Sequence, residues 1–210
     1  MNYILKGAKQ RLISGLREKG ITDENVLAAF DKVDRHKFLE SFMWDIAYAD
    51  RPLPIKYNQT ISQPFTVAFQ TQLLQIQKGD NVLEIGTGSG YQAAILCAMG
   101  AKVYTIERQI GLYKETKQLL EELDHRILTF FGDGFKGLPK FAPYDKIIVT
   151  CGAPEIPMPL INQLKTNGLM VIPVGENTQK MIRVTKTADN DYKEEVFGNF
   201  IFVPMLKETE

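Results

Sequence analysis

The sequence has few cysteines and few histidines, and this scarcity excludes several classes of protein. Its two cysteines, Cys97 and Cys151, do not lie in a CxxC or His-rich stretch of the kind that binds zinc. We therefore expect neither a metal site nor a disulfide framework, and both cysteines are predicted to be reduced thiols of a cytoplasmic protein. His36 and His125 stand apart from any candidate nucleophile. No Cys-His or Ser-His dyad is predicted.

The sequence also lacks a long hydrophobic run and an excess of charge of either sign. No apolar run approaches the roughly 20 residues that a bilayer requires. The first twelve residues, MNYILKGAKQRL, are too charged for a signal peptide. Lys plus Arg and Asp plus Glu each number 25, so no overall field would attract nucleic acid or an anionic membrane. We expect neither as a partner, and one domain over residues 1–210.

A short apolar strand followed by closely spaced glycines is the most informative stretch of the sequence. Residues 81–85 have the composition of a buried strand, and residues 91–99 predict an apolar helix that covers a sheet. Glycines in the turn 86–90 let the backbone approach a ligand and place N–H groups at a helix N-terminus. The Gly-x-Gly-x-Gly spacing differs from the Gly-x-Gly-x-x-Gly of dinucleotide-binding folds. With Glu84 just before it, this spacing is similar to the first motif of S-adenosylmethionine-dependent methyltransferases.

Two acidic residues follow the next two predicted strands. Glu107 ends the strand 102–106, about twenty residues after the first glycine, where an acid commonly binds ribose hydroxyls. Asp133 lies between two glycines after the strand 126–131, where a carboxylate suits an adenine amino group. Alternatively, Glu107 caps the following helix and Asp133 belongs to a plain Asp-Gly turn. Their positions at strand ends favour the ligand roles.

Strands and helices alternate through the second part of the chain. The pattern predicts parallel strands at 144–150 and 169–174, with a helix at 159–164 and the turn Asn167-Gly168 between them. It also predicts an antiparallel edge pair at 181–187 and 195–206. Such alternation predicts an α/β fold with a doubly wound, Rossmann-like sheet that is mostly parallel. Its ligand is expected outside the carboxyl ends of the strands. We assign residues 80–210 to this cofactor-binding core.

Residues 1–79 are predicted to form an N-terminal helical elaboration on the substrate side. Apolar residues at helical spacing predict an amphipathic helix over 4–19, and a second helix follows it. A polar turn then leads to a helix that starts at Pro64. Ser62 lies at or near the N-cap of that helix, and a cap alone would explain it. The many small polar side chains beside the cofactor strand favour a functional role instead.

These segments together resemble the protein-L-isoaspartate O-methyltransferase family. The matching stretches are QTISQP at 59–64, VLEIGTGSGYQ at 82–92, GDG at 132–134, APYDKIIVT at 142–150, APEIP at 153–157 and GLMVIPVG at 168–175. The glycine motif is common to many methyltransferases, whereas QTISQP and APEIP are more specific to this family. The sequence departs from the family pattern at Asn58, Leu138 and Ile201. These departures bear on peptide preference more than on reaction type.

The resemblance implies transfer of a methyl group from S-adenosyl-L-methionine to the free carboxylate of L-isoaspartyl residues in damaged proteins and peptides. S-adenosyl-L-homocysteine is then the other product, and the methyl ester starts repair by collapsing to a succinimide. By the same resemblance, Ser62 is the catalytic residue. The implied cofactor-binding residues are Thr60, Ile61, Gly86, Thr87, Gly88, Ser89, Gly90, Glu107, Arg108, Asp133 and Gly134, and the implied substrate-binding residues are Gln63, Pro64 and Val203. We expect a monomer whose partners are isoaspartyl-containing proteins and peptides.

The sparse inventory of candidate bases is compatible with this chemistry. A carboxylate with a pKa of about 4 is ionised at neutral pH, so its attack on a methyl group requires no general base. Ser62 would orient the carboxylate by a hydrogen bond. Two rival classes stay open: a small-molecule methyltransferase with a closed apolar pocket in place of QTIS and APEIP, and a cofactor-binding protein without turnover.

Overall fold

The computed structural model describes residues 3–189 and 191–210 and arranges them in layers around a mostly parallel sheet. The helices are α1 (Tyr3–Glu18), α2 (Glu24–Lys32), α3 (Pro64–Leu74), α4 (Tyr91–Ala98), α5 (Ile110–Glu122) and α6 (Met158–Asn162), with the 3-10 helices η1 (Arg35–Phe38), η2 (Ser41–Ile46) and η3 (Pro139–Phe141). The strands are β1 (Leu53–Pro54), β2 (Thr60–Ile61), β3 (Asn81–Ile85), β4 (Lys102–Glu107), β5 (Ile127–Phe131), β6 (Tyr144–Val149), β7 (Leu164–Val174), β8 (Gln179–Ala188) and β9 (Asp191–Phe200).

In the described part of the chain, seven strands form one sheet in the order β5-β4-β3-β6-β7-β8-β9. Pairing is parallel from β5 through β7 and antiparallel for β8 and β9. The predicted doubly wound sheet with an antiparallel edge pair is therefore confirmed. Because β4 and β6 flank β3 on opposite sides, the strand order reverses at β3. Such a switch point opens a crevice at the carboxyl ends of the strands.

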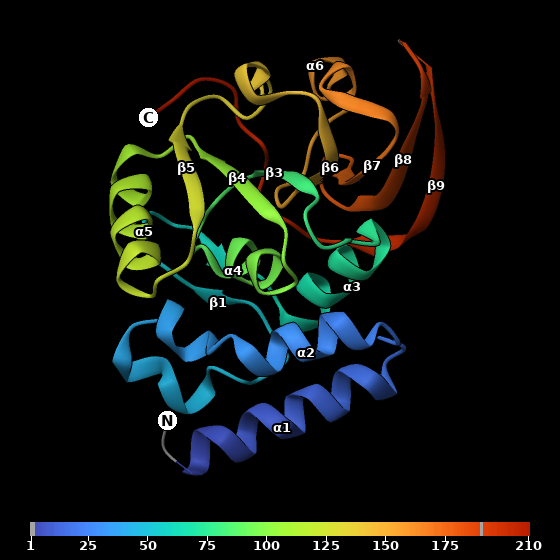
Figure 1. Cartoon of the computed structure of the whole chain (residues 1–210). Helices are drawn as coiled ribbons and strands as arrows, with labels where there is room; N and C mark the ends of the chain where they lie inside the picture. The colour runs from blue at the N-terminus through green and yellow to red at the C-terminus, as the bar shows by residue number, and fades with distance from the viewer. Residues whose placement is uncertain (1–2, 190) are drawn as a thin grey trace.

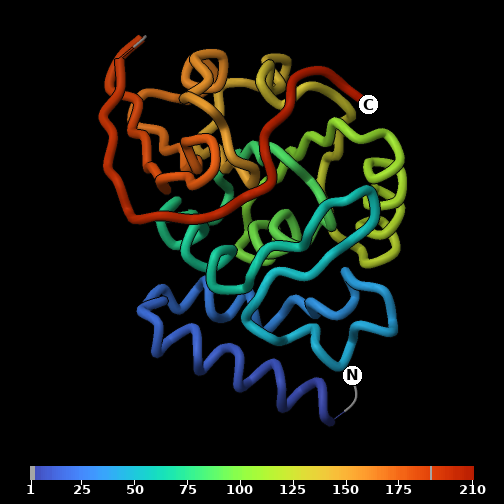
Figure 2. The backbone as a smooth tube through the Cα atoms, turned by 180° about the vertical axis from the view of Figure 1, so that it is seen from behind, coloured from blue at the N-terminus to red at the C-terminus, as the bar shows by residue number. Residues whose placement is uncertain are grey.

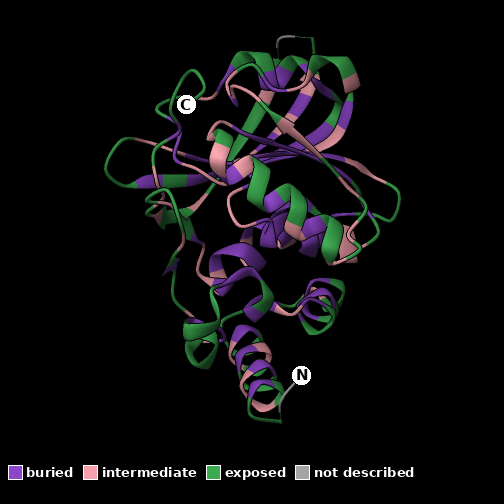
Figure 3. Cartoon of the chain, turned by 90° about the vertical axis from the view of Figure 1, so that its left-hand side faces the viewer, coloured by how far each residue is buried: buried purple, intermediate pink, exposed green. Residues whose placement is uncertain are grey.

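Both faces of the central strands are buried, which explains why their sequences are apolar at nearly every position. Val82 packs on one face with residues of α3 and α4, and Leu83 packs on the other with residues of α6. From bottom to top, Figure 1 shows α1 and α2, then α3 and α4, then the sheet, then α6. Figure 3 shows that buried residues gather between these layers, while the outer side of α5 is exposed.

The N-terminal helices pack on the outer side of α3 and α4 rather than on the sheet. Leu16 of α1 and Phe30 of α2 belong to the same hydrophobic cluster as Tyr91 of α4. A largely buried ion pair fixes α1 further, because Lys9 Nζ lies 3.0 Å from Asp34 Oδ1. The residues before and after position 80 therefore share one core. No helix of the described residues is long and apolar enough to cross a membrane.

Two local features differ from the sequence-based expectation. The pair Asn167-Gly168 is not a turn before a strand but an irregularity inside β7, where Asn167 has a φ of 64°. Asn and Gly tolerate such left-handed backbone, so the same dipeptide serves turns and bulges. The expected strand 195–206 stops at Phe200. The chain then returns to the carboxyl edge of the sheet, where Gly152 forms an isolated bridge with Pro204.

Candidate active site

A pocket opens at the carboxyl ends of β3, β4 and β6, at the point where the strand order reverses. Most of its walls come from segments that are distant in sequence: residues 59–62, 84–89, 91–92, 106–109 and 203–206. Val67, Gln70, Gly134, Thr150 and Cys151 complete the lining. Figure 2 shows the C-terminal segment crossing the same side of the molecule as the chain around β1 and β2. The sheet thus brings the predicted cofactor loop and the polar turn before α3 into one site.

The glycine loop adopts a backbone that other residues rarely adopt. Gly86, Gly88 and Gly90 have φ values of 94°, 52° and 83°. A Cβ on Gly86 would lie 2.7 Å from Thr150 Oγ1, which donates a hydrogen bond to the Gly86 carbonyl oxygen. The loop therefore requires glycine both for its conformation and for its contact with the end of β6.

Glu107 supports this loop and lines the pocket as well. Its Oε2 accepts a hydrogen bond from the Gly88 N–H at 3.0 Å. Its Oε1 accepts hydrogen bonds from the N–H groups of Arg108 and Gln109 at 2.9 and 3.0 Å. Acceptor capacity remains on Oε2 because a carboxylate oxygen can accept more than one hydrogen bond. Glu107 thus lies near the start of α5, as the capping alternative expects, and in the pocket wall.

Glu84 is a pocket residue that the sequence analysis used as part of a motif but did not assign to the site. Its side chain is fully buried, and its Oε2 accepts a hydrogen bond from Thr105 Oγ1 at 2.5 Å. The other oxygen, Oε1, has no hydrogen-bond partner among the described residues. Burial raises the pKa of Glu84 to about 8. An acid inside an otherwise apolar strand was the signal that marked this position.

Two glutamine side chains also line the pocket and were not predicted. Gln92 donates a hydrogen bond from Nε2 to Thr71 Oγ1 at 2.9 Å, while its Oε1 has no partner among the described residues. Gln70 donates to the Val149 carbonyl oxygen at 3.0 Å. Gln92 lies in an otherwise apolar helix, whereas α3 carries other polar residues besides Gln70. The buried, unpaired amide oxygen of Gln92 indicates a place for a hydrogen-bond donor of a ligand.

Ser62 lines the same pocket together with Thr60 and Ile61. No described residue forms a hydrogen bond with Ser62 Oγ, whereas the Ser62 carbonyl oxygen accepts one from Arg35 Nη1 at 3.0 Å. Helix α3 has Gln63 as its N-cap residue, and no side chain at that position caps it. Asp50 takes this role from a distant segment, because its Oδ1 accepts the Phe65 N–H at 2.8 Å. The alternative in which Ser62 merely caps α3 is therefore wrong.

Of the other predicted site residues, most line the pocket and four do not. Lining residues include Thr87, Ser89, Arg108, Gly134 and Val203. The four outside the lining are Gly90, at the N-cap of α4, Gln63, Pro64 and Asp133.

Contacts of these residues explain their positions. Gln63 Nε2 donates to the Asp50 carbonyl oxygen at 3.1 Å, and Pro64 is the buried first residue of α3. Asp133 Oδ2 accepts the N–H of Glu208 at 3.3 Å, while Oδ1 accepts the N–H of Phe135 at 2.9 Å. The C-terminal segment therefore occupies one side of Asp133.

Comparisons with known proteins show the family to which the chain belongs. A model of the family described as protein-L-isoaspartate(D-aspartate) O-methyltransferase matches residues 7–210. The chain belongs to this family. It is 53% identical over 207 residues to the protein-L-isoaspartate O-methyltransferase of Christiangramia forsetii, a match that covers 98% of this chain and 97% of that protein. The corresponding protein of Flavobacterium psychrophilum is 53% identical over 204 residues, with coverage of 97% and 96%. The predicted family resemblance is confirmed.

Solved structures give the same fold. A protein-L-isoaspartate O-methyltransferase structure superposes with a TM-score of 0.86 at 28% identity, covering 93% of this chain and 65% of that longer chain. A putative member of the family from Plasmodium falciparum, solved in complex with S-adenosyl-L-homocysteine, superposes with a TM-score of 0.83 at 24% identity, covering 94% and 98%. The Rossmann-like methyltransferase fold predicted from the sequence is confirmed.

Proposed function

We propose that the protein transfers the methyl group of S-adenosyl-L-methionine to the free carboxylate of L-isoaspartyl residues in damaged proteins and peptides, which starts repair through a succinimide. The observation that carries this proposal is that Ser62, without a hydrogen-bond partner on Oγ among the described residues, shares one pocket with the glycine loop and Glu107. The chain's family membership supports the same activity.

The residues of the pocket fit S-adenosyl-L-methionine. Glu84 Oε1 is buried and unpaired among the described residues, so it would hold the ammonium group of the methionine part. Glu107 would accept hydrogen bonds from the ribose hydroxyls. We keep Asp133 as a proposed contact of the adenine amino group, because Gly134 beside it lines the pocket. When bound, the cofactor supplies an electrophilic methyl group on a positively charged sulfur.

Ser62 is proposed to orient the substrate carboxylate, and Gln63 and Pro64 are proposed to hold the turn that carries Ser62. Val203 lines the pocket from the C-terminal segment and is proposed to contact the substrate. The described residues of the pocket lining include no histidine that would activate Ser62 as a nucleophile. The chain therefore contributes position rather than proton transfer. Alignment of two reactants can account for about 7–11 kcal/mol of a barrier.

A methyl-transfer assay with labelled cofactor tests this function. We expect label to appear in an isoaspartyl peptide as a base-labile ester, and none in the peptide after mild alkaline treatment. Label confined to a small-molecule acceptor would favour the small-molecule methyltransferase instead. Cofactor binding without any transfer would favour the binding protein without turnover.

We also propose a monomeric, cytoplasmic protein that does not bind nucleic acid and in which residues 1–210 form one domain. The hydrophobic cluster shared by α1, α2 and α4 supports one domain, since residues before position 80 pack directly on the cofactor-binding core. Cys97 and Cys151 are free thiols, which suits a reducing compartment. Light scattering after size exclusion measures the oligomeric state, and a single cooperative unfolding transition is expected of one domain.

A further inference from the structure

Arg35 is a buried cation that no described carboxylate pairs with. Its side chain is fully buried on η1, and it forms no ion pair with a described residue within 4.0 Å. Its guanidinium donates instead to three backbone carbonyl oxygens: Nε to Ala47 at 2.8 Å, Nη1 to Ser62 at 3.0 Å, and Nη2 to Arg51 at 3.5 Å. A buried charge is costly unless hydrogen bonds satisfy it, and these three carbonyl oxygens accept the hydrogen bonds of the guanidinium.

The guanidinium also contacts the cofactor side of the site. Arg35 Cζ lies 5.2 Å from the ring centroid of Tyr91, within the range of a cation–π contact. Tyr91 is the first residue of α4, directly after the last glycine of the loop, and it lines the pocket. One side chain therefore touches both the turn that carries Ser62 and the helix that starts at the cofactor loop.

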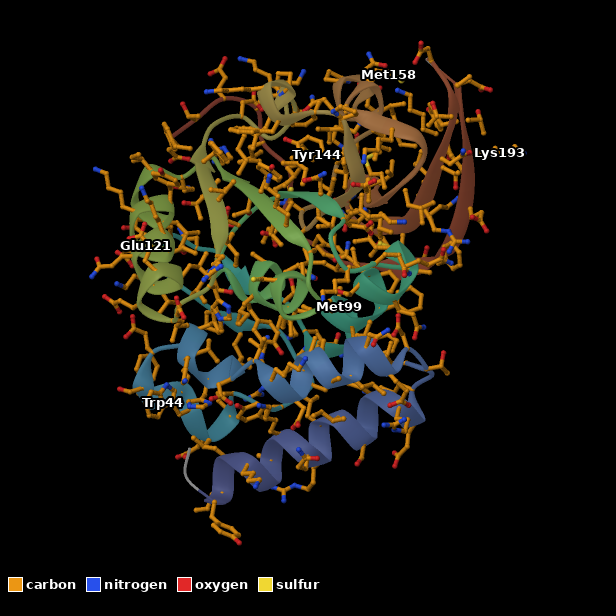
Figure 4. The ribbon with its side chains drawn as sticks, viewed as in Figure 1. Trp44, Met99, Glu121, Tyr144, Met158 and Lys193 are labelled. Atoms are coloured by element: carbon orange, nitrogen blue, oxygen red, sulfur yellow. The ribbon has the colours of Figure 1, made fainter. Side chains whose placement is uncertain are left out.

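The residues on either side of Arg35 in the sequence, Asp34 and His36, are held in place by side-chain contacts. The preceding residue, Asp34, forms the ion pair with Lys9 of α1 at 3.0 Å. The following residue, His36, lies with Nδ1 2.9 Å from Tyr48 Oη and packs edge-on against Trp44, with 5.1 Å between ring centroids. Figure 4 labels Trp44 in the N-terminal part of the molecule. These contacts fix η1 and therefore the backbone of Arg35.

We propose that Arg35 is a positioning residue for methyl transfer, which fixes the backbone of Ser62 relative to the glycine loop. Arg suits this task because its planar fork donates several hydrogen bonds in fixed directions. Burial lowers the pKa of Arg35 to about 10, which leaves the guanidinium charged at neutral pH. In-line transfer depends steeply on the placement of the two reactants. The inference rests on the proposed function, because it assigns Arg35 to the reaction at that site.

The kinetic test compares Arg35→Ala with Tyr144→Phe. The control removes the hydrogen bond that Tyr144 Oη donates to the Leu138 carbonyl oxygen at 2.8 Å. Tyr144 is buried in the cluster that contains Leu83, on the other face of the sheet, so the control measures how much activity a general loss of packing costs. We expect kcat for an isoaspartyl peptide to fall about 10-fold or more in Arg35→Ala, with S-adenosyl-L-homocysteine affinity changed less than about 3-fold. Guanidinium ion, at concentrations well below those that unfold the protein, should restore part of kcat in Arg35→Ala and none in Tyr144→Phe.

A second readout does not depend on turnover. Hydrogen exchange followed by mass spectrometry should show faster exchange in residues 59–66 of Arg35→Ala than of the wild type, and guanidinium ion should slow it again. If Arg35→Ala does not fold, Arg35→Lys replaces it, because lysine keeps the positive charge but lacks the planar guanidinium. We expect the same loss of kcat and the same faster exchange in residues 59–66 of Arg35→Lys.

Wild-type kcat in a folded Arg35 variant, or an equal loss in Tyr144→Phe, would overturn the assignment. Unchanged exchange in residues 59–66 would also overturn it. An inactive wild-type protein would instead contradict the proposed function, while the exchange experiment would still report on the link between Arg35 and the Ser62 turn.

Discussion

Asp50 caps the helix that follows Ser62: its Oδ1 accepts the Phe65 N–H at 2.8 Å across fifteen positions of sequence. The remote carboxylate satisfies a backbone donor at the N-terminus of α3 that a local side chain would otherwise satisfy. A second bond joins the same two segments, because Gln63 Nε2 donates to the Asp50 carbonyl oxygen at 3.1 Å. The hydroxyl of Ser62 is left available to the pocket.

This arrangement separates activity from stability at Ser62. We expect Ser62→Ala to lower kcat/KM about 10- to 100-fold, a loss of roughly 1.4–2.7 kcal/mol in the transition state, because the substrate carboxylate loses its hydrogen bond. The free energy of unfolding should change by less than about 0.5 kcal/mol. Steady-state kinetics and urea denaturation of the same preparation measure the two quantities. Wild-type turnover in the folded variant would remove Ser62 from the mechanism.

Asp50→Ala should instead lower the stability of the protein. The variant loses the cap of α3, and such a loss typically costs about 1 kcal/mol of stability. It also loses an ion pair with Lys19, in which Nζ lies 2.5 Å from Asp50 Oδ2. Chemical denaturation should therefore give a lower free energy of unfolding than for Ser62→Ala. Equal stability of Asp50→Ala and the wild type would show that α3 does not depend on this cap.

Glu84 should make stability depend on pH. Burial raises the pKa of Glu84 from its ordinary value of 4.5 to about 8, so the folded protein binds this proton more tightly than the unfolded chain. The stabilising contribution is complete below pH 4.5 and is lost as the pH rises toward about 8. Glu84→Gln carries no such proton. As the pH rises within that window, we expect the free energy of unfolding of the wild type to fall relative to that of Glu84→Gln, by up to about 1.4 kcal/mol per pH unit.

Urea denaturation at a series of pH values measures this difference for the cofactor-free protein. The same substitution should weaken S-adenosyl-L-homocysteine binding, because the ammonium group of the ligand favours the ionised form of Glu84, which an amide cannot adopt. Parallel stability curves for the two proteins would contradict the raised pKa.

Glu107→Ala should weaken cofactor binding for two reasons. It removes the proposed partner of the ribose hydroxyls, and it leaves the N–H of Gly88 without its acceptor. We expect the affinity for S-adenosyl-L-homocysteine, measured by calorimetry, to fall by about 1–3 kcal/mol. Glu121→Ala on the exposed side of α5 is the matched control, and its affinity should equal that of the wild type. Equal affinity in both variants would remove Glu107 from the cofactor site.

Much of the fold could be predicted because its signals are local. The strand 81–85, the glycine loop and the helix after it are adjacent in sequence, and the structure has them as β3 and α4. The acid at the end of β4 followed from the same reasoning, since parallel strands present their carboxyl ends at one edge.

The missed features depend on contacts between distant residues. The cap on α3 comes from Asp50, and the buried guanidinium of Arg35 reaches Ser62 across 27 positions. Neither partner is marked by spacing or periodicity. That Glu84 Oε1 is buried and unpaired likewise depends on how the surrounding elements pack, so the sequence alone does not show it. Sequence patterns predict elements well, whereas side-chain partners depend on how those elements pack.

The most direct test of the proposed function compares two peptides that differ only at one residue, isoaspartyl in one and normal aspartyl in the other. With labelled S-adenosyl-L-methionine, we expect rapid, base-labile methyl incorporation into the isoaspartyl peptide, and conversion of part of it to the aspartyl form over repeated cycles. The aspartyl peptide should take up far less label, because its carboxylate lies at a different distance from the backbone. Equal incorporation into the two peptides would contradict the account and indicate a general carboxyl methyltransferase.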